Sequence, residues 1–390
     1  MPEKPGSQRP EGSISELPTL KPPPPNPFER KGEGFALSKV SVGKYEFISP
    51  EPGRSTANQD ALWENADRDG TAVTVFVGDG IGGYAGGEIA SSTVRSTIAR
   101  ENKKFEAIQQ KRNRGEGVGP GLQAEMKAMR AVLATANEDL ELARHMHAED
   151  SPALKGMGTM GTLVRMVKMK DGRSEAVIGH YGDTRAMVLY PDGHLETVTL
   201  DAHPEFLRIK NTHGEEAALH VQSVLDRLDT HREFQHLLEC SFEEGKWPEN
   251  APVTKEDIAF VEQVLGNVHV HAYFEYRNFS HKAFAREDKR RTRRFEEPDI
   301  RHVLIPAGGK LILTSDGIHD NLTTQEMEAI LADGDGVFVD PMLMMYAAQG
   351  KTPAERLSEA AKARALFHAY SPRSKGPDDL TAVVVEIPER

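Results

Sequence analysis

The sequence predicts an α+β protein in which antiparallel sheets are covered by helices. Short apolar segments follow one another across turns that contain Asp-Gly pairs, at 170–173 and 191–194, which is typical of strands linked by hairpins. Segments with helical spacing stand in groups between these strands, whereas a parallel sheet needs strands and helices in regular alternation. These two observations favour antiparallel sheets with helices packed on them.

Composition narrows the class of protein. The chain has 390 residues and a formal net charge of -12, and an acidic chain binds nucleic acid poorly because phosphates need clustered Lys and Arg. Neither a long apolar run for a membrane span nor an apolar signal-peptide core is found. The single cysteine, Cys240, fits a reducing compartment and is expected to be a small buried hydrophobe. We therefore expect a cytoplasmic monomer that binds neither nucleic acid nor membranes.

Residues 1–37 differ in composition from the remainder of the chain. They are rich in Pro, Gly, Ser and charged residues, and they include the run KPPPPNP at 21–27. Such a segment buries too little apolar surface to fold by itself. We predict a disordered Pro-rich N-terminal arm over 1–37 and one domain over 38–390.

The first half of the domain is expected to alternate between strands and helices. An alternating pattern at 36–49 predicts an early pair of strands, and 72–77 predicts a strong strand. Helical spacing predicts helices over 88–100 and about 120–147. Further strands are expected at 161–169, 174–182 and 184–190.

The second half begins with a mostly polar, helical region. Residues 204–272 predict a helical insert or flap, with its clearest helices at 215–228 and 254–266. A strand is then expected within 310–317 and a last strand at 380–387.

Two helix starts stand between these last two strands. Thr323 and Glu326 have the spacing of a capping box, in which each residue caps the other. Thr352 followed by Pro353 predicts a second helix start, with Pro in the first turn.

The glycine-rich segment after the strong strand allows several interpretations. Gly78, Gly80 and Gly83 match a dinucleotide-binding fingerprint, but no second parallel strand ending in an acidic residue follows. Asn65 could begin a calcium loop, but Phe76 occupies the position that requires a bidentate Glu. The remaining interpretation takes Asp79, in the middle of this segment, as a cation ligand.

Other aspartates occupy similar positions at strand ends. Acidic side chains that meet at one edge of a sheet repel one another unless hard cations neutralise them. The segments NQDA, GHYGDTRA, LILTSDGIHD and GPDDLTAVVVEI place such residues beside apolar strands: Asp60, Asp183, Asp316, Asp378 and Asp379. Together with Asp79 they predict a site for hard cations.

Six segments in chain order resemble a known family. They are NQDA, VGDGIGGYAGGEIAS, GTMGTLV, GHYGDTRAMVLY, LTSDGIHDNLT and PDDLTAVVVEI. They are similar to the motifs of the metal-dependent serine/threonine protein phosphatases of the PPM type, the protein phosphatase 2C family, and mostly to its bacterial branch. The resemblance covers about 38–390 except the helical insert. It implies a four-layer α-β-β-α sandwich of two antiparallel sheets flanked by helix pairs.

The resemblance also implies a site and a reaction. Asp60 and Asp79 would bind a pair of Mn²⁺ or Mg²⁺ ions, with Asp79 bridging them and Gly80 contributing its carbonyl oxygen. Asp316 and Asp378 would complete the coordination shell of the second ion. Asp183 would help to bind a possible third ion. A hydroxide that bridges the metals would attack phosphoserine or phosphothreonine of a protein substrate, without a covalent phosphoenzyme.

Several positions depart from the family pattern. The phosphate-clamping arginine is expected five residues before Asp60, where Ser55 stands, so Arg54 is the candidate for this catalytic role. Ile81 occupies the place of a histidine that would protonate the leaving group in eukaryotic members. His319 could replace it, although a structural histidine is the simpler interpretation.

Two other features leave alternatives open. His269 and His271 would share one face of a strand, without enough further ligands for zinc. The basic run 282–295 is either a solvated face or a docking site for an acidic phosphoprotein. The alternative to an enzyme is a pseudophosphatase of the same fold that acts as a binding or sensor module.

Overall fold

The structure is a computed structural model, and its described part leaves out the arm predicted over 1–37. The described residues are 39–45, 58–67, 70–81, 86–114, 121–228, 231–243, 246–266, 269–270, 283–284, 297–332, 341–367 and 378–389. All of them belong to one compact unit, Gly34–Arg390. The division into an arm and a domain stays a prediction.

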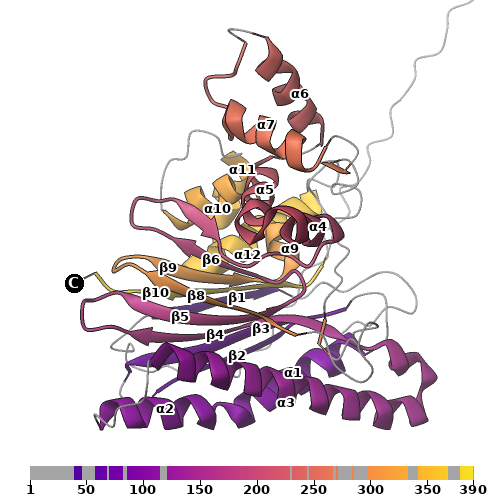
Figure 1. Ribbon diagram of the computed structural model, residues 1–390, viewed down its shortest axis with the longest axis vertical. Coiled ribbons are helices and arrows are strands. Elements are labelled where there is room, and N and C mark those ends of the chain that lie inside the picture. Colours follow the sequence, from indigo (N-terminus) through magenta and orange to yellow (C-terminus); the bar gives the residue numbers. More distant parts are fainter. Residues whose placement is uncertain are drawn as a thin grey trace, which may run out of the picture. The chain divides into compact units, whose positions relative to one another are not determined.

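Two five-stranded sheets, antiparallel throughout, form the centre of this unit (Figure 1). The first has the order β1-β10-β9-β6-β7, and its strands are Lys39–Tyr45, Leu380–Glu386, Lys310–Thr314, Arg185–Leu189 and Leu195–Thr197. The second has the order β2-β3-β4-β5-β8, and its strands are Ala61–Ala66, Ala72–Gly80, Thr159–Lys168, Ser174–Tyr181 and Asp299–Ile305.

The two sheets pack face to face through alternate side chains. Val75 and Val77 of β3 share a buried cluster with Leu311, Leu313 and Val383 of the other sheet. Phe76 points the other way, into a cluster with helical residues, because successive side chains of a strand face opposite sides.

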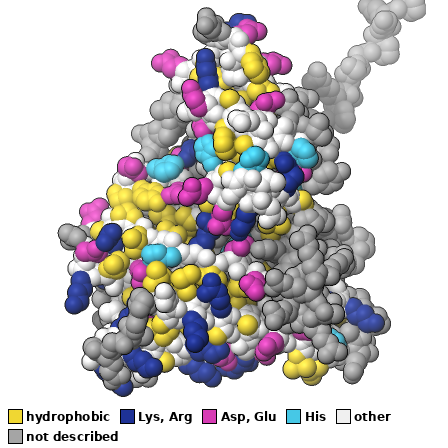
Figure 2. Space-filling model, viewed as in Figure 1, with side chains coloured by type: hydrophobic (Ala, Val, Ile, Leu, Met, Phe, Trp, Pro, Cys, Tyr) yellow, Lys and Arg dark blue, Asp and Glu magenta, His cyan; other side chains and the backbone are white. Residues whose placement is uncertain are grey.

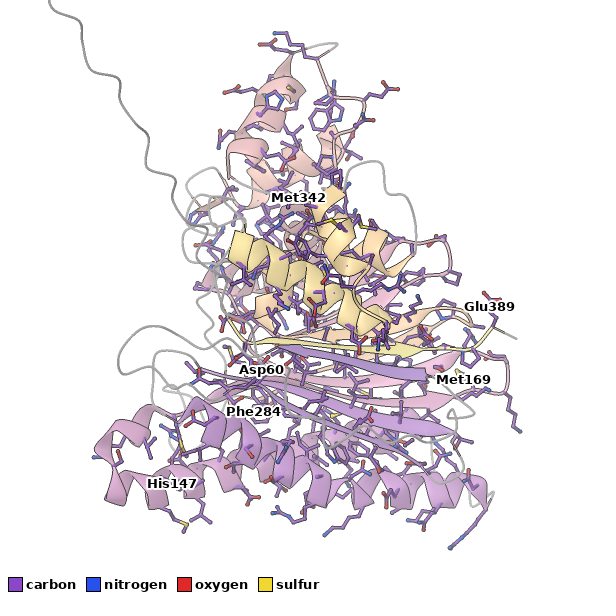
Figure 3. The ribbon with its side chains drawn as sticks, turned by 180° about the vertical axis from the view of Figure 1, so that it is seen from behind. Asp60, His147, Met169, Phe284, Met342 and Glu389 are labelled. Carbon is purple, nitrogen blue, oxygen red and sulfur yellow. The ribbon has the colours of Figure 1, made fainter. Side chains whose placement is uncertain are left out.

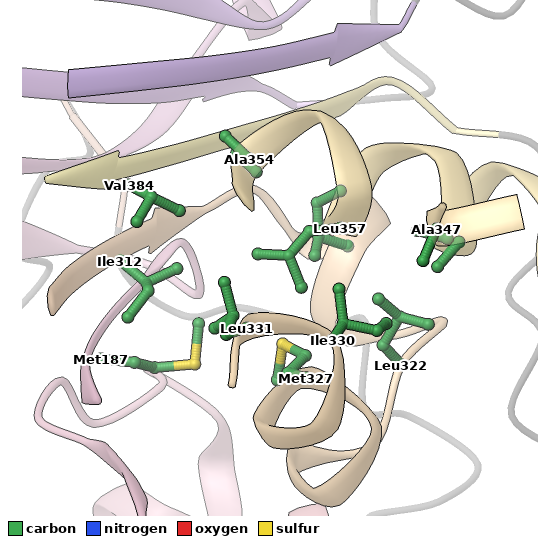
Figure 4. Close-up of a cluster of buried hydrophobic side chains, with 14 of the residues drawn as sticks. Met187, Ile312, Leu322, Met327, Ile330, Leu331, Ala347, Ala354, Leu357 and Val384 are labelled. Atoms are coloured by element: carbon green, nitrogen blue, oxygen red, sulfur yellow. The ribbon is translucent and has the colours of Figure 1, made fainter. Parts of the chain in front are cut away.

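Helices cover the outer face of each sheet. α1 (Gly87–Glu101), α2 (Lys103–Asn113) and α3 (Gly121–Asp150) pack on the β2-β3-β4-β5-β8 sheet. α10 (Thr324–Leu331), α11 (Pro341–Ala347) and α12 (Pro353–Phe367) pack on the other sheet, where Met327 and Leu357 contact the side of the sheet that carries Ile312 (Figure 4). The predicted four-layer α-β-β-α sandwich is therefore confirmed.

Both predicted helix starts are present. The Thr323 N–H donates to Glu326 Oε2 at 2.8 Å, and the Glu326 N–H donates to Thr323 Oγ1 at 3.2 Å, which completes the capping box of α10. The same reciprocal pair joins Thr352 and Glu355 before α12.

Four helices between β7 and β8 share a hydrophobic core of their own. They are α4 (Pro204–His213), α5 (Glu215–Arg227), α6 (His231–Phe242) and α7 (Lys255–Val264), and we call them the helical subdomain. Phe206, Val221, Phe234 and Val261 each contribute to this core. Figure 1 shows α6 and α7 extending away from the sheets, while α4 and α5 lie next to them.

Some elements differ from the sequence expectations. β1 pairs with β10, with Val42 opposite Val383, and the other residues of the strand pair expected over 36–49 lie outside the described residues. The edge strand β8 was not predicted, because its alternate residues are polar and partly exposed. His269 and Val270 are helical, so the strand expected there is wrong. No helix in the described ranges is both long and apolar enough to cross a membrane.

Candidate metal centre

The predicted carboxylates all stand at the ends of strands. Asp60 directly precedes β2, and Asp79 is the penultimate residue of β3. Asp183 lies in the turn between β5 and β6, Asp316 begins the short helix α9 (Asp316–His319) after β9, and Asp378 precedes β10. Four of the side chains are buried, at 4–9% exposure, and Asp378 is partly buried. Figure 3 places Asp60 at one end of the sheets.

The other four carboxylates surround Asp79. Burial raises the pKa of Asp79 well above its ordinary value, and the negative charges of the other four raise it further: Asp316, Asp60, Asp378 and Asp183. Charge interactions fall with distance, so all four carboxylates lie near Asp79 although they come from both sheets. The sandwich therefore gathers acidic groups from positions 60 to 378 around one buried aspartate.

This cluster is not assembled as a finished coordination shell. Within the described ranges, no three His, Cys, Asp or Glu side chains already stand in an arrangement that would hold a metal ion. Carboxylates repel one another, and they approach to ligand distance when a cation compensates their charge. The donor set consists of carboxylate oxygens, which suits Mn²⁺ or Mg²⁺.

Asp60 is held by residues of the opposite sheet. Thr381 Oγ1 of β10 donates a hydrogen bond of 2.6 Å to Asp60 Oδ2, and Asp379 Oδ2 accepts one of 2.7 Å from the Gln59 N–H. The Thr381 N–H in turn donates to Ser315 Oγ at 3.0 Å, beside Asp316. Sequence reasoning missed Thr381 and Ser315, and their only signal was their position within the two acidic motifs.

The end of β3 is fixed by backbone contacts that require glycine. The Gly80 N–H donates to the Gln59 carbonyl at 3.1 Å, and Thr159 Oγ1 donates to the Asp79 carbonyl at 2.6 Å. A Cβ atom on Gly80 would lie 2.5–2.8 Å from the backbone of Gly87 in the first turn of α1. Only a glycine allows this approach, so Gly80 sets how closely α1 meets the strand that carries Asp79.

The turn that carries Asp183 is also tightly held. Gly182 has a left-handed φ of 92°, which favours glycine. Its carbonyl accepts hydrogen bonds from the Ala202 N–H at 2.7 Å and from His180 Nε2 at 3.0 Å. Because a carbonyl only accepts, this contact places a proton on His180 Nε2, and Nδ1 of the same ring lies 3.0 Å from Thr162 Oγ1.

Two other predicted residues have structural contacts. His319 is 1% exposed, and its Nδ1 lies 2.8 Å from Thr314 Oγ1, which agrees with a structural histidine. Cys240 of α6 is buried, 7% exposed, as expected for a small hydrophobe. Arg54, the phosphate-clamp candidate, lies outside the described residues.

Only part of the predicted histidine pair, His269 and His271, and of the basic run 282–295 lies in the described residues. His269 Nδ1 forms an ion-pair contact of 2.9 Å with Glu205 Oε1, while His271 lies outside the described residues. Figure 2 shows histidine side chains at the level of α4 and α5, among interspersed acidic and basic groups. Of the run 282–295, only Ala283 and Phe284 are described, and both are buried.

Comparisons with known proteins agree with the fold. No protein-family model and no curated protein sequence matches the chain. The solved structure of serine/threonine phosphatase Stp1 from Staphylococcus aureus is similar, with a TM-score of 0.50 and 18% identity over 92% of this chain and 98% of that chain.

Two further solved structures also match the chain, with lower TM-scores. A serine/threonine phosphatase from S. agalactiae has a TM-score of 0.48 at 16% identity, and PstP/Ppp from Mycobacterium tuberculosis has 0.46 at 18%. Both matches cover 90% of this chain and 100% of the other. At such identities the likeness concerns the fold, and the comparison with Stp1 carries it. The chain therefore has the fold of the bacterial PPM-type serine/threonine phosphatases, as its motifs predicted.

Proposed function

We propose that this protein is a Mn²⁺- or Mg²⁺-dependent protein phosphatase that hydrolyses phosphoserine and phosphothreonine monoesters of protein substrates. The supporting observation is the burial of Asp79 among four other carboxylates. Buried carboxylates of like charge lower the stability of the fold unless cations compensate their charge. A cluster of five carboxylates therefore favours a role in cation binding. The fold of the phosphatases agrees with this proposal.

The proposal assigns each acidic residue a role. Asp60, Asp79 and the carbonyl oxygen of Gly80 would bind a pair of metal ions. Asp316 and Asp378 would complete the coordination shell of the second ion. Asp183 would help to bind a third ion. When bound, such ions supply an activated water as nucleophile and neutralise charge on the phosphoryl oxygens.

The chain itself then contributes orientation and proton supply. Thr381 and Thr159 orient Asp60 and the Asp79 backbone through the bonds described above. The Ile81 side chain has no ionisable group, and the Nδ1 atom of His319 lies within hydrogen-bond distance of Thr314 Oγ1. We therefore propose that water donates the proton to the leaving group. Arg54 remains the proposed phosphate clamp.

The alternative function is a pseudophosphatase that binds phosphoproteins without turnover. The five aspartates favour the enzyme, whereas the unplaced Arg54 keeps the alternative open. A cytoplasmic, monomeric protein is part of the proposal, and it rests on the single cysteine and the composition.

The deciding experiment is hydrolysis of a small aryl phosphate with and without Mn²⁺, for the unchanged protein and Asp79→Asn. We expect turnover only with Mn²⁺ and a loss of at least about 100-fold in Asp79→Asn. Metal-independent turnover, or none with Mn²⁺ present, would contradict the proposed function.

A further inference from the structure

Helix α5 of the helical subdomain presents two buried polar side chains to the sandwich. Gln222 is 0% and Asp226 is 2% exposed. They stand four residues apart and therefore lie on the same face of the helix. Buried amide and carboxylate groups lower stability unless they are hydrogen-bonded or paired, so their partners reveal what this face of α5 does.

Gln222 binds the segment that leads from β7 into the helical subdomain. Its Oε1 accepts a hydrogen bond of 2.8 Å from the Asp201 N–H, and its Nε2 donates one of 3.1 Å to the Thr199 carbonyl. One side chain thus satisfies a donor and an acceptor of the backbone between 199 and 201. This fixes the segment against α5.

Asp226 acts on the same segment through a charge. Arg185 of β6 donates to Asp201 through Nε and a terminal nitrogen, at 3.0 and 2.6 Å, and its other terminal nitrogen lies 3.1 Å from Asp226 Oδ2. All three side chains are buried, at 2–6% exposure. Two carboxylates therefore share one guanidinium, which joins α5, the 199–202 segment and β6.

The 199–202 segment in turn holds the turn that carries Asp183. The Ala202 N–H donates to the Gly182 carbonyl at 2.7 Å, immediately before Asp183. Thr199 Oγ1 accepts from the Ala186 N–H at 3.0 Å, just after Arg185. The turn is thus anchored on both sides of Asp183 to a segment that α5 itself holds in place.

We propose that Gln222 and Asp226 are positioning residues for Asp183, through which the helical subdomain controls the proposed third cation site. The inference rests on the proposed function only for the role of Asp183 in binding an ion. The mechanical link from α5 to the Asp183 turn stands on the hydrogen bonds alone. A substrate or partner that moves α5 would thereby alter the metal centre.

The first test needs no metal. Backbone hydrogen exchange at 182–185 is compared between the metal-free unchanged protein and Asp226→Asn, which keeps the shape and removes the charge. Exchange is expected to become about tenfold faster there, while Glu216→Gln, at an exposed position on the same helix, changes nothing. An unchanged rate at 182–185, or an equal increase throughout the chain, would overturn the inference.

The second test measures direct Mn²⁺ binding by calorimetry. Asp226→Asn is expected to lower the Mn²⁺ affinity of the weakest class of sites by about tenfold, because a contact that supports a metal ligand is lost. Asp226→Glu keeps the charge and should show a smaller loss of affinity. Asp183→Asn should remove that class, and adding Asp226→Asn should cause no further loss. Additive losses would mean that Asp226 acts independently of Asp183, and they would overturn the inference.

Two safeguards keep the tests decisive. If Asp226→Asn fails to fold by circular dichroism, Gln222→Met, which removes both hydrogen bonds, serves in its place with the same expected results. If the unchanged protein binds no Mn²⁺, the proposed function and the link to a cation site both fail. The exchange experiment then still decides whether α5 positions the Asp183 turn.

Discussion

Thr381 donates a 2.6 Å hydrogen bond to Asp60 across 321 positions of the chain. The bond runs from β10 of one sheet to the residue before β2 of the other, and both side chains are buried. This bond fixes the orientation of a proposed ligand before any ion is present.

Thr381→Val tests this orientation. The substitution keeps the shape and removes the donor, so Asp60 can rotate away from the cluster, and we expect Mn²⁺ affinity to fall by about tenfold. Calorimetric Mn²⁺ titration measures the effect. Thr212→Val, which removes an exposed hydroxyl on α4, is the matched control. Equal Mn²⁺ affinities for the two variants would contradict an orienting role.

The positions of the acidic residues were predictable from the sequence, whereas their supporting contacts were not. Apolar runs that end at Asp79 or Asp316 predict a strand and locate its end to within a few residues. Thr381, which supports Asp60, and Asp201, which pairs with Arg185, lie in other segments of the chain than their partners. A threonine in a strand or an aspartate before a helix also has no distinctive sequence pattern. Such contacts depend on sheet order and register, which local patterns do not encode.

The incorrect strand expectation at His269 has a similar cause. The alternation of Val and His there has the period of a strand, but the segment follows α7 closely, and His269 pairs with Glu205 of α4. Here tertiary contacts override a short alternating pattern. The helical insert, the capping box of α10 and the start of α12 were predictable because helical spacing and cap residues are local signals.

Gly80→Ala should impair both folding and metal binding. The added methyl group would overlap the backbone of Gly87, so β3 and α1 must separate, at a cost of about 1–3 kcal/mol in the free energy of unfolding. Urea denaturation and Mn²⁺ titration measure the two effects. Gly193→Ala also strains the backbone, because Gly193 has a left-handed φ of 89°, but its methyl group meets nothing within 4 Å, and it should leave Mn²⁺ binding unchanged. Unchanged Mn²⁺ binding in Gly80→Ala would be evidence against the close approach.

Metal removal should make stability depend on pH in a defined direction. The pKa of Asp79 in the folded protein lies well above its ordinary value of 3.8, mainly through burial and then through the four neighbouring charges. Between these two pKa values the folded state binds more protons than the unfolded state, so stability falls as pH rises. Burial also raises the pKa of Asp201, to about 6, and this acts in the same direction.

Thermal unfolding in EDTA across pH 4–7 measures this dependence. Asp79→Asn removes one of the clustered charges, so it should raise the melting temperature of the metal-free protein at pH 7 while abolishing turnover. Saturating Mn²⁺ should stabilise the unchanged protein more than the variant. A metal-free Asp79→Asn protein that melts below the unchanged protein at pH 7 would argue against strong repulsion at this site.

A second buried ion pair should matter for stability alone. Arg165 of β4 is fully buried and donates to both carboxylate oxygens of Asp67, at 3.0 and 2.6 Å, and to Thr74. Asp67→Ala removes the carboxylate that forms both hydrogen bonds to the guanidinium, and we expect a loss of about 3–5 kcal/mol in the free energy of unfolding. Urea denaturation measures this loss. The Mn²⁺ affinity of the folded fraction should not change, and a change there would show that this pair also supports the metal centre.

The helical subdomain should select protein substrates, and its exposed surface provides the test. Deleting the whole 204–272 region would also remove Gln222 and Asp226, so a surface substitution separates substrate choice from the state of the metal centre. Phe242 of α6 is 78% exposed, and a large apolar side chain in this position can contact a protein substrate. Phe242→Ser should therefore raise the KM for a phosphoprotein several-fold and leave the kcat for a small aryl phosphate unchanged.

Leu142→Ser is the matched control for this experiment. Leu142 is also strongly exposed, at 61%, but it lies on α3 of the opposite helical layer. If only the α6 variant loses phosphoprotein activity, the helical subdomain provides a substrate contact. If both variants lose it equally, or if Phe242→Ser also slows aryl phosphate hydrolysis, α6 has no specific role in substrate choice. Because α6 and α7 share a core with α5, a substrate held there would contact the same helical subdomain that anchors the Asp183 turn.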